Sequence, residues 1–296
     1  MTDQNSFAIG VIGERINPGF KSVKALFENE DLPGIQALAV RQVDAGARYL
    51  NVNIGARALT DPDFMAEVIR AIQAVVTVPL SFDFPSAQVQ EICLKSYDRE
   101  RAGGAMPIVN SITEHRWDLM ELYGDHGPFK VILMASERVE DGVALNNKTA
   151  SEIHTTARRS ALRLCRDYGM AMDDIFVDMS VSAIIADTVG LNRATLDAVR
   201  LIGEDPDLKG IHMMGGLSNI GQQLPPKAAD GSDLKHMLEC AFLTLAVPYG
   251  FDYVLGTPWR GYHPLPDDNY VMTAYRNFLE QSGSNALRAV RKLYRA

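Results

Sequence analysis

The segment GIHMMGGLSNIGQQLP, residues 210–225, joins a short apolar run to a polar ending framed by glycines. The apolar part has the length of one buried β-strand. The glycines allow the backbone to turn sharply or to admit another group close to it. A strand that ends in this way places Ser218, Asn219 and Gln222 just beyond its last residue.

Seven further runs of the same kind occur along the chain. They are FAIGVIG, YLNVNIG, PLSFDF, MPIVNSI, FKVILMA, IFVDMSV and YVLGT. Continuous apolar runs suit strands that are covered on both faces. Helical patterns fill the gaps between them. Residues 33–47, for example, open with Pro33, repeat apolar residues on one face of a 3.6-residue period, and reach Gly46 as a stop signal.

The alternation of strand and helix predicts the fold. The other helical segments are 62–75, 86–98, 115–124, 151–169, 192–204, 232–247 and 266–281, with a last helix expected over 284–296. Eight strand–helix units in a row predict parallel strands with right-handed crossovers, and a closed (β/α)8 TIM barrel of the α/β class is the economical arrangement. An open doubly wound sheet is the alternative. No composition break divides the chain, so we expect one domain over residues 1–296, with long polar loops at 135–150 and 224–233.

Composition excludes several classes of protein. The net charge of −8 and the absence of basic stretches argue against a nucleic-acid or anionic-membrane surface. No apolar run reaches about 18 residues, the length that a membrane span needs. The N-terminus lacks a signal-peptide pattern, and three distant cysteines suggest reduced thiols, so we expect a cytoplasmic protein. Cysteine and histidine do not recur at zinc-ligand spacing, so we expect no metal to be bound by this chain.

Polar side chains gather where the predicted strands end. They are Glu14, Arg15, Asn17, Asn51, Asn53, Asp83, Asn110, Ser111, Asp178, Ser218, Asn219 and Gln222. Ligands of TIM barrels bind at the carboxyl ends of the strands. Carboxylates and amides together offer both acceptors and donors, which suits a flat heterocycle that bears ring N–H, amino and carbonyl groups.

Each of these side chains also has a structural interpretation. Asp83 and Asn110 are placed to cap the helices that follow, and Asn219 is placed to stabilise its own turn. Asp178 interrupts a buried strand, where an unpaired carboxylate is costly, so its structural interpretation requires a salt bridge.

Six motifs resemble, in order, those of the pterin-binding methyltransferases, which include methyltetrahydrofolate:corrinoid methyltransferases and the folate module of cobalamin-dependent methionine synthase. The motifs are IGERIN (12–17), AGARYLNVNIG (45–55), FDF (82–84), IVNSIT (108–113), FVDMSV (176–181) and GLSNIGQQLP (216–225). The last is the most specific of them. Their order and their placement at strand ends carry the resemblance, which runs through nearly the whole chain.

The resemblance implies roles for the strand-end residues. Asp83, Asn110 and Asp178 would hydrogen-bond the pyrimidine side of a pterin, and Asn219 would lie beside its position-5 nitrogen as the catalytic residue. The same site would include four further substrate-binding residues: Glu14, Asn53, Ser218 and Gln222. The implied reaction is methyl transfer between the cobalt of a corrinoid and tetrahydrofolate, or from 5-methyltetrahydrofolate in the opposite direction.

The corrinoid is expected on a separate protein. A built-in site of the base-off type has the pattern Asp-x-His-x-x-Gly, and none of the six histidines lies in that context. A corrinoid protein would therefore dock over the barrel mouth, framed by the loops at 135–150 and 224–233. The family often forms homodimers, which we also expect here.

Four positions depart from the family pattern. Asn51 replaces an acid of the second strand, Phe84 replaces a small hydroxyl residue, and Met179 stands where proline is common. Lys227 is the nearest match to an arginine that usually follows the seventh strand, so its role, like that of Asn51, is open.

Three other functions stand as alternatives. Dihydropteroate synthase shares the barrel and pterin pocket, but its first loop resembles Asn-x-Thr-Pro-Asp-Ser-Phe where this chain has ERINPGF, and Arg260 is the sole basic residue near the last strand. A serine hydrolase using Ser218 requires Gly-x-Ser-x-Gly, and the glycines here are one residue too far apart. A non-catalytic pterin-binding protein is the third.

Overall fold

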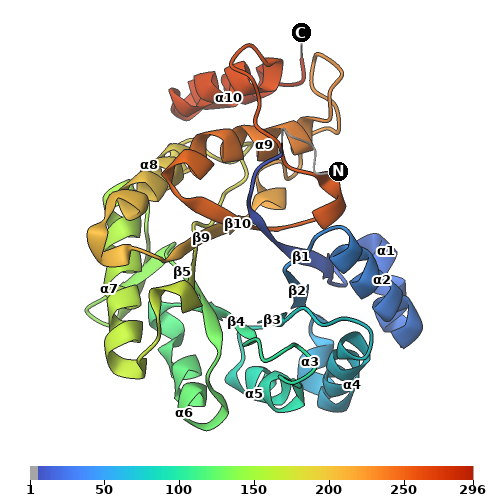
Figure 1. The fold of residues 1–296 in the computed structure, drawn as a ribbon. Coiled ribbons are helices and arrows are strands. Elements are labelled where there is room, and N and C mark those ends of the chain that lie inside the picture. The colour runs from blue at the N-terminus through green and yellow to red at the C-terminus, as the bar shows by residue number, and fades with distance from the viewer. Residues whose placement is uncertain (1–5, 296) are drawn as a thin grey trace.

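A computed structural model describes residues 6–295 and shows eight parallel strands closed into a barrel (Figure 1). The strands are β1 (Gly10–Ile16), β2 (Tyr49–Val52), β3 (Leu80–Asp83), β4 (Ile108–Ile112), β5 (Lys130–Met134), β8 (Ile175–Asp178), β9 (His212–Gly216) and β10 (Phe251–Gly256). Their order around the barrel is β1-β10-β9-β8-β5-β4-β3-β2, and β10 pairs with β1 to close the ring. This confirms the predicted (β/α)8 barrel and excludes the open sheet.

Helices surround the barrel (Figure 1). The α-helices are α1 (Lys21–Glu28), α2 (Leu32–Asp44), α3 (Arg57–Thr60), α4 (Pro62–Gln73), α5 (Ala87–Ser96), α6 (Leu122–His126), α7 (Ala150–Tyr168), α8 (Leu191–Glu204), α9 (Leu234–Ala246), α10 (Tyr270–Leu279) and α11 (Gly283–Lys292). Short 3₁₀ turns include η1 (Glu114–Glu121), η4 (Leu217–Asn219) and η6 (Pro258–Arg260). None of the helices in the described part of the chain has the length and apolar character of a membrane span.

Local sequence signals explain where the helices begin and end. The Asp31 side chain caps α2, and Gly46, with φ of +93°, lies just beyond its end. Helix α7 begins with a reciprocal capping box between Thr149 and Glu152 and ends at Gly169, which has a left-handed φ of 66°. The predicted start at residue 151 was therefore slightly late, because Thr149 caps the helix.

Two segments differ from the prediction. The polar loop expected at 135–150 contains an antiparallel hairpin, β6 (Glu137–Glu140) and β7 (Val143–Asn146). Asp141 and Gly142 have φ of 50° and 78°, the positive values that a tight two-residue hairpin turn requires. The helix expected at 115–124 is mostly the 3₁₀ turn η1, capped by Thr113.

One layer of the barrel interior is filled by apolar side chains from six strands: Ile12, Ile108, Ile132, Phe176, Met214 and Tyr253. The Phe176 ring lies 4.9 Å from the Tyr253 ring and 5.9 Å from the Tyr49 ring, centre to centre. Side chains of a strand alternate between its two faces, so the residue two positions further along each strand also points inward. Glu14, Asn110 and Asp178 occupy such positions, directly after this apolar layer.

Phe176→Ala tests whether this layer stabilises the barrel. Phe176 is fully buried, and removal of such a ring typically costs about 3–5 kcal/mol of unfolding free energy. We expect a loss of this size in urea unfolding followed by circular dichroism. Val143→Ala on the exposed hairpin is the control, for which we expect a change within about 0.5 kcal/mol. A similar small change for both variants would contradict the assignment of Phe176 to the stabilising core.

Candidate functional site

A group of hydrogen-bonded side chains, the amide–carboxylate cluster, joins β2, β3 and β4 and has Asn51 at its centre. The Asn51 Nδ2 donates to Asp83 Oδ2 at 2.9 Å, and the Asn51 Oδ1 accepts from Ser81 Oγ and Asn110 Nδ2, both at 3.1 Å. An aspartate at position 51 would place a second carboxylate against Asp83. The Asn51 amide instead supplies a hydrogen-bond donor to Asp83. Asparagine therefore suits this position, where the family usually has an acid.

Asp83 and Asn110 are cross-strand neighbours in this cluster. Each keeps one side-chain oxygen for which residues 6–295 supply no donor. Neither residue caps a helix, since Thr113 caps η1 and α5 follows Ser86 without a side-chain cap. The structural interpretation of Asp83 and Asn110 as caps is therefore wrong, and both retain hydrogen-bonding capacity for a ligand.

Asp178 ends β8 and accepts a hydrogen bond from the Ser180 backbone N–H at 2.7 Å. Burial raises the pKa of the Asp178 carboxyl to about 6, and the negative charge of Asp83 adds to the shift. The Asp83 and Asp178 carboxylates therefore lie close enough to repel each other electrostatically. Among the described residues no cation pairs with Asp178, whose neighbours are the Ser180 backbone and the Asp83 carboxylate, so the salt-bridge interpretation is also wrong.

Glu14 links the strands on another side of the barrel. Its Oε2 accepts from Ser218 Oγ at 3.2 Å and its Oε1 accepts from Thr257 Oγ1 at 3.1 Å. Burial raises the pKa of the Glu14 carboxyl, while the two hydroxyl donors partly offset this effect. The contacts join the end of β1 to the segments that follow β9 and β10.

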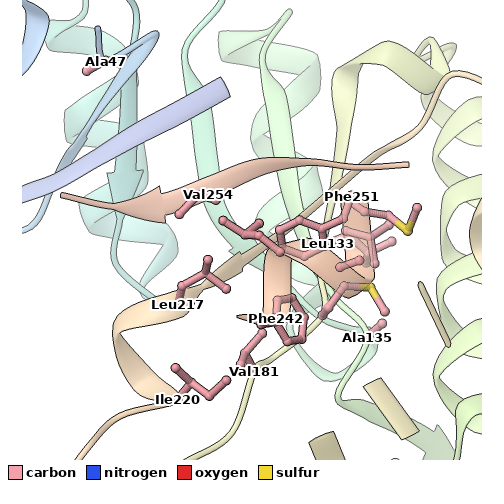
Figure 2. Close-up of a cluster of buried hydrophobic side chains, with 14 of the residues drawn as sticks. Ala47, Leu133, Ala135, Val181, Leu217, Ile220, Phe242, Phe251 and Val254 are labelled. Atoms are coloured by element: carbon pink, nitrogen blue, oxygen red, sulfur yellow. The ribbon is translucent and has the colours of Figure 1, made fainter. Parts of the chain in front are cut away.

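The turn that carries Asn219 is anchored by apolar side chains. Leu217 and Ile220 are fully buried on either side of the exposed Ser218 and half-buried Asn219. Figure 2 shows Leu217 and Ile220 beside Phe242 of α9, with Val181 from the segment after β8 close by. The backbone of Asn219 is therefore held in place, although its side chain is not buried.

The Asn219 amide has a defined orientation. Gln222 Nε2 donates to its Oδ1 at 2.6 Å, so the Nδ2 group remains as a donor with no acceptor among the described residues. A Cβ atom at position 216 would come within 3.2 Å of this Nδ2, closer than side chains ordinarily pack. Gly216 thus gives the amide room, in agreement with the close approach that the glycines of this segment indicate.

Other predicted residues have supporting or separate roles in the structure. The Asn53 Oδ1 accepts from the Gly55 N–H at 2.7 Å, which stabilises the turn after β2. Lys227 forms an isolated backbone bridge with Asp233. Arg260 pairs with Glu239 at 2.9 Å and with Asp233 at 3.3 Å.

The sequence interpretation missed three features of this region. Ser81 belongs to the amide–carboxylate cluster, and its position two residues before Asp83 on one strand face was the available signal. Thr257 donates to Glu14, which spacing along the chain does not reveal. His236, Cys240 and His263 come together, and the separation of four residues between the first two on a helix was the signal.

Known proteins resemble this chain in sequence. Residues 13–255 match the family described as pterin binding enzyme. A methylcorrinoid:tetrahydrofolate methyltransferase of Eubacterium limosum is 24% identical over 258 residues, which cover 84% of each protein.

Solved structures share the fold at lower identity. Dihydropteroate synthase from Thermus thermophilus superposes with a TM-score of 0.54 at 18% identity, covering 85% of this chain and 89% of that chain. The Yersinia pestis dihydropteroate synthase gives 0.54 at 15% identity, with coverage of 87% and 88%. The fold, together with the family match over most of its length, identifies this chain as a member of the pterin binding enzyme family.

Proposed function

We propose that this protein transfers a methyl group between a methylcorrinoid protein and the position-5 nitrogen of tetrahydrofolate. The observation that carries the proposal is the oriented amide of Asn219, whose carbonyl oxygen is occupied by Gln222 and whose N–H groups have no acceptor among the described residues. The Eubacterium limosum relative, named for this reaction, supports the same choice.

The pterin would bind against the amide–carboxylate cluster and Asp178. The pyrimidine end of a reduced pterin carries amino and ring N–H donors beside a carbonyl group. Asp83 and Asp178 supply acceptors for such donors, and charge-assisted hydrogen bonds of this kind are stronger than neutral ones. Asn110 adds a further side-chain oxygen. The cluster is fixed by internal hydrogen bonds before a ligand arrives, which reduces the entropic cost of binding.

Asn219 would act on the reacting nitrogen by donating a hydrogen bond. In transfer away from folate, the N–CH₃ bond breaks and its electron pair stays on the nitrogen, so a donor there stabilises the leaving group. In transfer to folate, the unprotonated nitrogen would attack the methyl group while the electron pair of the cobalt–carbon bond stays on the partner's cobalt. The methylated nitrogen would then lose its proton to solvent, and the amide would orient the ring throughout. An amide holds no transferable proton at neutral pH, so its role is electrostatic and positional. Glu14 would maintain the adjacent turn through Ser218.

The corrinoid partner would dock on the face where the βα connections emerge. The hairpin β6–β7 follows β5, and the 188–190 turn follows β8, so both belong to this face. They expose apolar side chains: Val143 is 57% exposed and Val189 is 69% exposed. Exposed apolar groups at such a face suit contact with another protein. A homodimer is part of the same proposal.

A dihydropteroate synthase reaction is the alternative that the structural neighbours raise. Release of pyrophosphate from a pterin substrate needs cations that can bind its phosphates. Arg260, the basic residue near the last strand, is already paired with Glu239 and Asp233. This pairing favours the methyltransferase. Production of dihydropteroate from the pterin diphosphate and 4-aminobenzoic acid would reverse that preference.

The direct test mixes the full chain with tetrahydrofolate and a methylated corrinoid protein. We expect the cobalt absorption spectrum to change from the methylated to the demethylated form while 5-methyltetrahydrofolate accumulates in equal amount. Methylcobalamin serves as a partner-free substrate that we expect to react more slowly. Tetrahydrofolate binding without any transfer from the methylated partner protein would reduce the function to pterin binding.

Asn219→Ala should slow methyl transfer. Loss of one hydrogen-bond donor at a site of developing charge typically lowers kcat by about 10²–10³-fold. Because Asn219 touches the reacting nitrogen in this proposal, we expect the KM for folate to change much less than kcat. Stopped-flow absorbance of the corrinoid measures both constants. Asn285→Ala on the exposed face of α11 is the matched control. Equal kcat values for the two variants would remove Asn219 from the mechanism.

Asp178→Asn should change how stability depends on pH. The native carboxyl has a pKa of about 6 and the ordinary value is 3.8, so between these values the folded chain binds more protons than the unfolded chain. The contribution of the Asp178 carboxyl to the free energy of unfolding therefore falls as pH rises from about 3.8 to about 6. The ligand-free variant should gain stability relative to wild type by up to about 3 kcal/mol at pH 7.

Urea unfolding of both proteins at pH 4 and pH 7 measures this difference. Asp268→Asn on the exposed connection before α10 is the control. A stability difference between Asp178→Asn and wild type that stays constant from pH 4 to pH 7 would contradict a raised pKa for Asp178.

A further inference from the structure

Three side chains of metal-ligand type meet between α9 and the connection that follows β10. His236 and Cys240 lie one turn apart on the same side of α9, and His263 comes from the connection. The Cys240 Sγ is 3.7 Å from His236 Nε2 and 3.9 Å from His263 Nδ1. All three atoms lie within 4.8 Å of one another.

The two sulfur–nitrogen separations are close to those around a tetrahedral metal ion. Zinc binds cysteine sulfur at about 2.3 Å and histidine nitrogen at about 2.0–2.1 Å, which places sulfur and nitrogen about 3.6 Å apart across a tetrahedral angle. The observed 3.7 and 3.9 Å are close to this value. Since Cys240 is fully buried and both histidines are half-buried, the three groups converge on an enclosed point rather than on open surface.

The surroundings of His236 have a second feature of metal sites. Its Nδ1 and the Oε2 of Glu239 lie 3.8 Å apart, and both are buried without a hydrogen-bond partner in the described chain. A histidine that ligates a metal commonly donates its other ring N–H to a carboxylate. Glu239 is the carboxylate next to this nitrogen, but the two atoms are too far apart for a hydrogen bond in this structure. The Glu239 Oε1 is held by Arg260 at 2.9 Å, which fixes the carboxylate in this position.

We propose that His236 Nε2, Cys240 Sγ and His263 Nδ1 bind one zinc ion, with the fourth position open to water. One thiolate and two imidazoles select zinc over magnesium or calcium, which prefer oxygen ligands. The ion would tie α9 to the connection after β10. That connection begins at Thr257, which donates to Glu14, so the ion would stabilise the wall beside the barrel mouth.

The test is a titration of the chelator-treated full chain with Co²⁺, followed by displacement with Zn²⁺. We expect one equivalent of Co²⁺ to bind and to produce a thiolate-to-cobalt charge-transfer band, which Zn²⁺ abolishes and Mg²⁺ leaves unchanged. Zn²⁺ should also raise the Tm of the protein in a concentration-dependent manner. These readouts need neither folate nor a corrinoid, so they are independent of the methyl-transfer proposal.

Variants identify the ligands. Cys240→Ser should abolish the charge-transfer band, and His263→Gln should weaken Co²⁺ binding by at least about tenfold. His263 is half-buried in a connection, so its variant remains informative if Cys240→Ser fails to fold. Cys165→Ser is the matched control and should bind as wild type does. Absence of the band in the wild type, or wild-type affinity in His263→Gln, would overturn the proposal.

Discussion

Alternation along the barrel strands is the constraint on which the rest of this structure depends. Every second side chain points inward, so a strand can place one residue in the apolar floor and its next inward residue in the polar rim. Ile108 and Asn110 form one such pair, and Phe176 and Asp178 form another. A shift of one residue in either strand would bury the polar group among the helices. The apolar floor and the polar rim therefore both depend on the register of the barrel strands.

The rim combines rigid and adjustable parts. Asn51 holds Asp83 and Asn110 through hydrogen bonds from both ends of its amide. Leu217 and Ile220 hold the Asn219 turn through apolar packing, while the amide of Asn219 is restrained only by the exposed Gln222 among the described residues. The proposed methyl transfer would use this division, with one wall binding the ring and Asn219 responding to the change of charge at the reacting nitrogen.

Sequence periodicity predicted all eight barrel strands, because buried parallel strands leave continuous apolar runs. It also located Asp83, Asn110, Asp178 and Asn219 at strand ends, since that position follows directly from the strand boundaries. The hairpin β6–β7 was missed because each strand has only four residues and half of the eight are polar, although Asp141–Gly142 is a typical hairpin turn. Partnerships such as Thr257 with Glu14 were unpredictable, because they join residues 243 positions apart.

The single amide at position 51 also determines which way hydrogens point around the rim. Its N–H faces an acceptor and its oxygen faces two donors, so a reversed amide would meet an unfavourable partner on each side. The Asn110 amide is oriented in turn, with its nitrogen toward Asn51 and its oxygen left over. The side-chain oxygens of this wall that lack a donor among the described residues are Asp83 Oδ1 and Asn110 Oδ1. A ligand that presents hydrogen-bond donors to these two oxygens would therefore be favoured over an isomer of the same shape without donors at that edge.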